Sequence, residues 1–360
     1  ALVHGTWRGT AHIAAKETKT NIASVAFHHN MKTSVGSATV TAQDIAFAPD
    51  KLQPENLSPL LAKLTRAKGS ADFTGQISWT ANAQKSRGTL RADGLDVTGP
   101  LGAMRDVKLH IDFTSLLPML TAPAQSFSAA SADWLLPLSN IQANFRLMAD
   151  GIHLNSASAL TGGGEISLSS LTLPYGPGST MTGTVELAHV NLNALIAASN
   201  LQDKVTLDVP VTGTIPFSLG PAGIRLHNGQ LQSDNQGRLA ISRSVWTGTD
   251  AGPPDALHDL AYQAMENLSI DEMDAVLNSL PNGRLGILFH VKGRNDPAVG
   301  QEARIGLIPL VRGEVLQEPL PLPKGTPVNL TLDTSLNFDE LLHAYQGVFG
   351  GGPSAQGAGK

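Results

Sequence analysis

Apolar and polar residues alternate along most of this chain. In "VTLDVPVTGTIPFSLG", residues 205–220, Val, Leu, Ile and Phe occupy odd positions, apart from Gly213. Thr, Asp, Pro, Ser and Gly occupy the even positions. Successive side chains of a β-strand point to opposite faces of its sheet, so a period of two predicts strands with one apolar and one polar face.

The same alternation recurs in "ADFTGQISW" (71–79), "VKLHIDF" (107–113), "RLAISRSVW" (238–246) and "RLGILFHVKG" (284–293). Short turn signals separate such segments, at 92–94, 149–151, 176–178, 220–223 and 235–237. Gly, Asn, Asp and Pro favour turns because they tolerate or fix the required backbone angles. The pattern therefore predicts a mainly β chain, folded as a long antiparallel meander.

A few short helices interrupt this pattern. Residues 58–67 and 191–200 are candidates of one to three turns, and residues 255–268 carry apolar side chains at helical spacing. Ser269 and Glu272 resemble a capping box that would begin a further helix over 271–280. A last helix is predicted over 337–349, followed by a disordered Gly-rich tail, 350–360. We expect residues 1–349 to form one continuous unit.

Composition narrows the function. Charged residues make up 15% of the 360 residues, the net charge is -5, and cysteine is absent. Nucleic-acid binding needs clustered Lys and Arg, which are missing here, and without cysteine there are neither disulfides nor thiolate metal sites. No run of 18 apolar residues occurs. Because the sequence opens on "ALVHGTWRGT", already in strand-like alternation, we expect it to be a piece of a longer protein, with any membrane anchor before residue 1.

Candidate catalytic groups are few. His28 and His29 are adjacent, so in a strand they would point to opposite faces. "TGGGE" (161–165) precedes a strand rather than a helix, which favours a bulge or tight turn over a phosphate-binding loop. Asp255, His258 and Asp259 fit a helix start. We expect no enzyme, no metal and no cofactor.

The apolar face is therefore the informative feature. A sheet with one apolar face must cover it with a second sheet, with helices or with a ligand. The predicted helices are too few to cover so many strands. A closed β-sandwich or barrel and an open sheet that binds an apolar ligand both remain possible from the pattern.

Several separated segments also resemble one family. They are "VPVTGTIPFSLGPAGIRLHNGQLQSDNQGRLAIS", "FTSLLPMLTAPAQSFSAASADWLLPLSNIQANFRL" with "LTGGGEISL", and "ALHDLAYQAMENLSIDEMDAVLNSLPNGRLGILFHVKGRNDP" through "PVNLTLDTSLNFDELL". In this order they resemble the C-terminal part of the YdbH family, which belongs to the AsmA-like, TamB-like group of bridge-like lipid transfer proteins of Gram-negative envelopes. The resemblance covers about 105–346, and the first hundred residues carry only the general alternation.

The resemblance implies an open, taco-like β-groove in the periplasm that carries phospholipid acyl chains between inner and outer membranes. The groove lining would then comprise Val107, Leu109, Ile111, Phe113, Ile166, Leu168, Val205, Leu207, Val209, Val211, Ile215, Phe217, Leu219, Leu239, Ile241, Ile287, Phe289 and Val291. The resemblance also implies a small outer-membrane lipoprotein partner, which would add a strand to the C-terminal edge near Val328, Leu330 and Leu332.

Two other functions stay open beside lipid transport. One is a structural or assembly module of the envelope with a closed β core, and a weaker one is an envelope hydrolase. The family's C-terminal region has also been described as a dicarboxylate transport domain. Dicarboxylates require inward Arg or Lys, whereas the charges here alternate with the apolar positions, so the residues favour lipid.

Overall fold

The structure is a computed structural model of the 360-residue chain. It describes residues 2–3, 5–15, 21–58, 61–99, 102–134, 136–175, 180–197, 202–220, 223–242, 262–281, 284–297 and 322–336.

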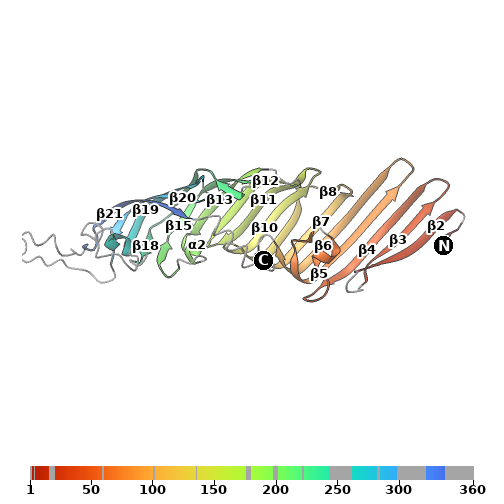
Figure 1. The fold of residues 1–360 in the computed structure, drawn as a ribbon, viewed down its shortest axis with the longest axis horizontal. Helices are drawn as coiled ribbons and strands as arrows, with labels where there is room; N and C mark the ends of the chain where they lie inside the picture. The colour runs from red at the N-terminus through yellow and green to blue at the C-terminus, as the bar shows by residue number, and fades with distance from the viewer. Residues whose placement is uncertain are drawn as a thin grey trace, which may run out of the picture. The chain divides into compact units, whose positions relative to one another are not determined.

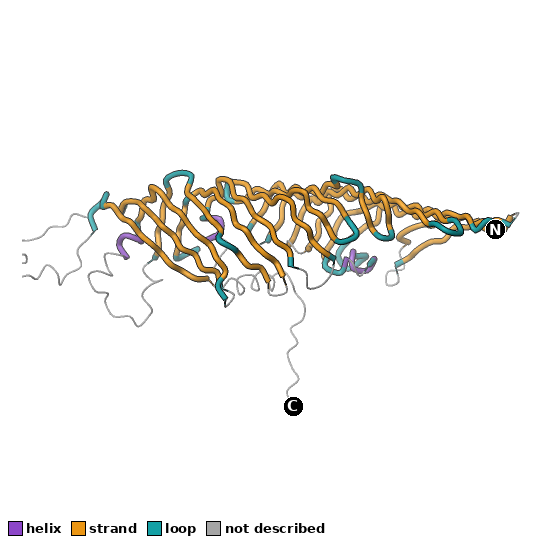
Figure 2. The backbone as a smooth tube through the Cα atoms, turned by 90° about the horizontal axis from the view of Figure 1, so that it is seen from above, coloured by secondary structure: helices purple, strands orange, loops and turns teal. Residues whose placement is uncertain are grey.

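Strands dominate the described residues, as the alternation predicts (Figures 1 and 2). Hydrogen bonding assigns the 21 described strands to one sheet, and every strand pair whose register is resolved is antiparallel. The described residues divide into two compact units. Unit 1 comprises Ala1–Ala159 and Ser167–Gly183, and unit 2 comprises Leu160–Ile166 and Thr184–Leu341. The prediction of one continuous unit over 1–349 stays a prediction.

The strands that lie in or begin in unit 1 are β1 (Leu2–Val3), β2 (Thr6–Ala14), β3 (Asn21–Asn30), β4 (Val35–Phe47), β5 (Thr65–Trp79), β6 (Gln84–Gly99), β7 (Gly102–Leu116), β8 (Met119–Thr121), β9 (Gln125–Asp133), β10 (Pro137–Leu147), β11 (Gly151–Thr161) and β13 (Met181–Asn191). The strands that begin in unit 2 are β12 (Gly164–Pro174), β14 (Val205–Asp208), β15 (Pro210–Gly220), β16 (Gly223–Leu226), β17 (Gly229–Ser233), β18 (Gly237–Ile241), β19 (Leu268–Ser279), β20 (Leu285–Asn295) and β21 (Pro327–Leu336).

In unit 1 the strands follow one another in chain order. Each of β1 to β6 pairs with the next strand, and β7 pairs with both β9 and the short β8. β9 then pairs with β10. Among the described strand pairs of this unit whose register is resolved, none joins β10 back to β1 or β2, so the sheet is open rather than closed into a barrel.

In unit 2 several short strands lie end to end and together take the place of longer strands. β14 and β15 follow each other in one line. The chain then returns antiparallel to them, with β16 and β17 paired to β15 and β18 paired to β14. β13 pairs with the other side of β15. β19 pairs with both β17 and β18, and β20 and β21 follow it. Among the described strands of this unit, β21 pairs with β20 alone, so this sheet is also open.

Several long strands contain a local break in the alternation. Asp44, Arg66, Asp106 and Asn140 adopt left-handed backbone angles, with φ of 51°, 52°, 50° and 47°. A residue with left-handed backbone angles adds one position to the strand. Two side chains that flank it at a spacing of three, instead of two, then point to the same face. Buried pairs therefore occur at this spacing, as in Met104 with Val107 and Leu138 with Ile141.

Polar side chains from neighbouring segments satisfy the backbone N–H groups at these breaks. The amide of Asp44 donates to Asp72 Oδ1 (2.8 Å), and the amide of Asp106 donates to Asp96 Oδ1 (3.0 Å). Next to Arg66, the amide of Ala67 donates to Gln53 Oε1 (2.7 Å). A bulge interrupts the hydrogen bonds between strands, so these bonds supply partners for the backbone at each break and stabilise the bends in the sheet.

The helix predicted over 271–280 is wrong, because these residues belong to β19. The register of β19 against β20 shifts between Ile270 and Glu272, so Ile270 and Met273 both lie buried despite a spacing of three. That spacing imitates a helix. The proposed capping residue Glu272 instead accepts a hydrogen bond from Lys292 Nζ on β20 (2.8 Å).

The other helix predictions have mixed outcomes. α2 (Asn193–Ala197) lies inside the predicted 191–200. The helix predicted over 58–67 is wrong, since α1 is Pro54–Leu57 and β5 has begun by Thr65. Residues 262–266 are helical, in agreement with the end of the predicted 255–268, although β19 begins at Leu268. Residues 255–261, including Asp255, His258 and Asp259, and the predicted helix and tail after 336 lie outside the described residues.

The turn predictions are mostly confirmed. A turn at 162–163 joins β11 to β12, and Gly162 and Gly163 both have positive φ, so "TGGGE" is a tight turn. The predicted turns at 149–151 and 235–237 also separate strands. Residues 92–94 do not form a chain reversal, because β6 continues through them with an irregularity at Gly94. The turn signal at 176–178 lies outside the described residues.

Candidate functional site

The candidate site is the apolar face of the sheet. Paired residues on adjacent strands point to the same face, so the registers show which side chains share it. In unit 1 we define the apolar face by Trp7, Gly9, Ala11, Ile13, Ala23, Val25, Phe27, His29, Gly36, Ala38, Val40, Ala42, Ala71, Phe73, Gly75, Ile77, Trp79, Leu90, Ala92, Leu109, Ile111, Phe113, Phe127 and Ala129. In Figure 1 strands β2 to β7, which carry most of it, lie side by side.

Charged groups of these strands lie on the other face. One row across the sheet places Asp72, Arg91 and His110 opposite one another. Among the residues that define the apolar face of unit 1, His29 is the one titratable side chain. The charges thus stay in water, where they need no compensating partner, while the opposite face remains available to apolar groups.

Glycines shape the apolar face of unit 1. Phe27 lies over Gly9, and Phe73 lies against both Gly75 and Gly88, which pair with each other across β5 and β6. A Cβ at any of these glycines would approach the aromatic ring to 3.3 Å or less. The aromatic side chains therefore lie along the sheet, and this fills the gaps that glycine leaves in a strand.

The four residues of β7 that were predicted to line the groove lie on the same face of the sheet. Val107, Leu109, Ile111 and Phe113 pair in register with Leu95, Ala92, Leu90 and Gly88 of β6. Val107 and Ile111 are buried, and Leu109 and Phe113 are half-buried. Leu168, on the part of β12 that belongs to unit 1, is half-buried too. The alternation correctly predicted that the four residues of β7 share one face, while their contact with lipid and that of Leu168 stay predictions.

The predicted lining residues of unit 2 also share one face. Leu207 pairs with Leu239, Val205 with Ile241, and Phe217 with Leu226. Ala275 lies between Leu231 and Phe289, and Phe289 pairs with Leu332 of β21. The predicted edge residues Val328, Leu330 and Leu332 thus extend this apolar face.

Burial divides these residues into two groups. Val209 and Val211 are fully buried, and Leu239 and Val291 are nearly so, within a core that includes Leu268, Ile270 and Met273. Half-buried side chains pack against that core, namely Ile166, Val185, Leu207, Ile215, Leu226, Ile241, Ile287, Phe289, Val328, Leu330 and Leu332. Phe217 and Leu219 are half-buried as well.

Ion pairs line the polar face of unit 2. Arg294 Nη2 donates to Asp271 Oδ1 (2.9 Å) and Lys292 Nζ to Glu272 Oε2 (2.8 Å). These hydrogen bonds raise the pKa of both Lys292 and Arg294. The two cations of β20 therefore face carboxylates of β19 on the polar side, which does not suit an inward dicarboxylate site.

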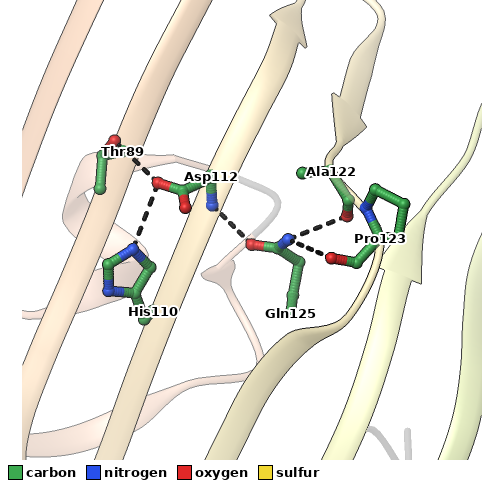
Figure 3. A network of polar contacts seen from close by, with 6 residues as sticks. All are labelled: Thr89, His110, Asp112, Ala122, Pro123 and Gln125. Carbon is green, nitrogen blue, oxygen red and sulfur yellow. Dashed lines mark hydrogen bonds and ion pairs between the residues drawn. The ribbon is translucent and has the colours of Figure 1, made fainter.

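A polar network on unit 1 brings together residue types that could support catalysis (Figure 3). Thr89 Oγ1 donates to Asp112 Oδ1 (3.1 Å), and His110 Nε2 lies 3.2 Å from the same oxygen. A nucleophile needs its hydroxyl on a base, but Thr89 and His110 both contact the carboxylate rather than each other. Buried Gln125 accepts from the amide of Asp112 (2.6 Å) and donates to the carbonyl oxygens of Ala122 and Pro123, so the network holds β7 to the start of β9.

His28 and His29 point to opposite faces, as predicted. His28 Nδ1 lies 3.1 Å from Ser37 Oγ, and the two residues are paired on the polar face. His29 Nδ1 accepts from Trp79 Nε1 (3.1 Å) on the apolar face. Among the described residues, no group of three or more His, Cys, Asp or Glu side chains could hold a metal ion. No described helix is long and apolar enough to span a membrane.

With this geometry in place, the comparisons with known proteins decide the family. The family model "YdbH-like: Intermembrane phospholipid transport protein YdbH" matches residues 2–348. The chain belongs to the YdbH-like family. The match includes the first hundred residues, whose sequence carries only general alternation, so the family resemblance extends further than 105–346. No curated protein and no solved structure matched the chain.

Sequence reasoning missed two features of the YdbH-like face. The lining prediction left out β2–β6, although the alternation of residues 71–79 was a sufficient signal for Phe73 and Ile77. It also missed the contact of Trp79 with His29, which are 50 positions apart. No local pattern marks that contact, because it depends on the register of β3, β4 and β5.

Proposed function

We propose that this YdbH-like chain carries phospholipids between the inner and outer membranes, with acyl chains lying along the apolar face and headgroups in water. The observation that carries the proposal is the separation of the two faces over β2–β9. Every charged side chain of the paired segments that define the face lies opposite it, apart from the titratable His29.

The energetics support an extended apolar surface. Each CH₂ group removed from water contributes about 0.8 kcal/mol, so an acyl chain of roughly sixteen carbons needs on the order of 10 kcal/mol of shelter to cross an aqueous gap. An aliphatic face that continues from strand to strand provides such shelter. It requires no specific binding residue, which agrees with the position of the charged side chains on the opposite face.

The half-buried residues are the proposed lipid contacts. In unit 1 these are Leu109 and Phe113, and in unit 2 Leu207, Ile215, Phe217, Ile287 and Phe289. Val209, Val211 and Val291 lie too deep to contact a chain directly and serve instead as the support beneath it. This division refines the prediction that all of them line the groove.

The proposal places the protein in the periplasm, anchored through the inner membrane. It also includes a small outer-membrane lipoprotein that adds a strand at β21, next to Val328, Leu330 and Leu332. A half-exposed strand of alternating residues can offer backbone groups to a partner strand. Support for these parts comes from the family resemblance and from the place of β21 after β20.

One observation favours the alternative of a closed structural module for unit 2. Five of its core side chains, Val209, Val211, Leu268, Ile270 and Met273, are completely shielded from water by the protein itself. If unit 2 only supports the envelope, its half-buried residues would capture no lipid.

Site-specific photo-crosslinking in cells tests the proposal. A probe at Leu109 is compared with one at neighbouring Lys108, and a probe at Leu207 with one at Asp208. We expect phospholipid adducts at Leu109 and Leu207 and none at the two polar-face positions, identified by mass spectrometry. Equal labelling of both faces, or no lipid at either leucine, contradicts the proposal. Adducts at Leu109 but not at Leu207 would mean that unit 2 has a structural role and does not contact lipid.

A further inference from the structure

One end of the apolar face in unit 1 combines aromatic rings with polar groups. Trp7, His29, Gly36 and Trp79 pair in a row across β2, β3, β4 and β5. Trp7 is 49% exposed and Met31, in the turn after β3, is 59% exposed. The Trp7 indole Nε1 donates to Met31 Sδ (3.0 Å). We name this row the rim cluster.

Gly36 allows the rim cluster to form. The Trp79 ring crosses β4 directly over Gly36, where a Cβ would collide with the indole. By crossing there, Trp79 Nε1 reaches His29 Nδ1 at 3.1 Å, and the two rings stack with centroids 6.0 Å apart. A larger residue at position 36 would separate the two rings.

The hydrogen bond fixes the tautomer of His29. An indole N–H can only donate, so Nδ1 of His29 must accept, and the neutral ring then carries its proton on Nε2. Both indole N–H groups of the rim cluster are already used, by Met31 and His29. Among the described residues none accepts a hydrogen bond from His29 Nε2, which leaves this donor available on the apolar face. The same row continues to Gln84, which pairs with Trp79.

This arrangement matches the boundary region of a phospholipid. Tryptophan prefers the place where an apolar surface meets a wet, polar one, because its ring is apolar and its N–H needs a partner. From His29 the apolar face continues along the same strand through Phe27 and Val25. Exposed Lys32 follows in the turn after β3, so an ammonium group lies at the same strand end.

We propose that the rim cluster is a headgroup station, where His29 Nε2–H donates to a phospholipid phosphate while the acyl chain lies on Phe27 and Val25. Lys32 supplies the countercharge. The station rests on the proposed lipid transport and adds to it a defined place where a headgroup pauses.

Nuclear magnetic resonance of the ¹⁵N-labelled protein tests the station. The indole signal of Trp79 is followed during titration with dihexanoylphosphatidylglycerol, with dihexanoylglycerol, which lacks the phosphate, and with inorganic phosphate. We expect the phosphatidyl compound to bind about tenfold more tightly than dihexanoylglycerol, since a hydrogen bond to a charged group contributes roughly that factor. Inorganic phosphate should produce no shift at the same concentration.

Three variants separate the hydrogen bond from packing. His29→Phe keeps a ring but loses the donor, and should bind the phosphatidyl compound about tenfold more weakly. His29→Gln retains a donor and should bind nearly as the unchanged protein does. His28→Phe, one residue along on the polar face, is the matched control and should have no effect.

Three outcomes overturn the station: equal binding with and without the phosphate, the same response to inorganic phosphate alone, or unchanged affinity in His29→Phe. The crosslinking probes at Leu109 and Leu207 separate this result from the transport proposal. If lipid adducts form at these probes but His29→Phe binds the phosphatidyl compound as the unchanged protein does, the station alone is rejected. If no lipid adducts form at either probe, the proposed transport itself is rejected.

Discussion

The apolar faces of the two units arise from the same alternation but differ in how far they are covered. On β3 of unit 1 Phe27 is 37% exposed, and Trp7 and Ile13 on the paired β2 are more exposed still. In unit 2 Val209 and Met273 are 0% exposed. Figure 2 shows the strands nearest the N-terminus as a single layer.

One sequence pattern can thus produce either an exposed surface or a buried core. Alternation decides which side chains share a face, but bends and returning strands decide whether water reaches that face. In unit 2 the returning β16–β18 and the long β19 bring several apolar rows onto one cluster. In β2–β4 the exposed apolar side chains retain the capacity to accept a ligand.

The largest effect is expected from Val209→Asp in unit 2. A carboxylate in this fully buried site has no partner, so we expect destabilisation of about 4 kcal/mol or more and loss of the folded unit. Urea unfolding and limited proteolysis measure it, with Thr206→Asp on the polar face as the control. Near-normal stability of Val209→Asp would show that unit 2 has an open face like that of β2–β4.

A pair of identical substitutions compares the two units directly. Met273→Ala in the core of unit 2 should cost about 2–5 kcal/mol, because it leaves a cavity. Met31→Ala, at an exposed position of unit 1, should change stability by less than about 0.5 kcal/mol. Urea unfolding of both variants gives the two values. Similar costs at both positions would remove the distinction between surface and core.

Gly36→Ala should have an intermediate effect and should alter the face of unit 1. The new methyl group collides with the Trp79 ring and approaches the backbone oxygen of His28 to 2.7 Å, so we expect a cost of about 1–3 kcal/mol. The Trp79 N–H signal should move as its bond to His29 breaks. Thr39→Ala, on the polar side of the same strand, serves as control, and an unmoved indole signal would contradict the prediction.

The smallest effect concerns surface ion pairs, whose contribution to stability we expect to be similar in both units. Hydrogen bonds from His153 and Lys324 lower the pKa of Asp150 in unit 1 and of Asp296 in unit 2 below 3.8. A lowered pKa adds stability above pH 3.8 that disappears as the pH falls through the lowered value.

The unchanged protein should have a higher urea midpoint at about pH 7 than at about pH 3, in part because of these two carboxylates. Asp150→Asn and Asp296→Asn should each reduce that difference slightly, and by similar amounts. A large effect in one unit alone would mean that charge, rather than burial, distinguishes the units.

The alternation of apolar and polar residues was enough to predict most strands, the side chains that share a face and the side on which the charges lie. Leu207, Asp208 and Val209 alternate in the chain and alternate in the sheet, because the period of two belongs to the extended backbone itself. The same local rule failed at Ile270–Met273, where the shifted register imitated a helix.

Burial depth and contacts between distant side chains follow from the way the strands pair and bend in three dimensions. Burial of Val209 depends on strands that return from elsewhere in the chain, and the bond between Trp79 and His29 depends on the registers of three strands and on the missing side chain of Gly36. These are properties of pairing and curvature between strands, which no period within a single strand contains.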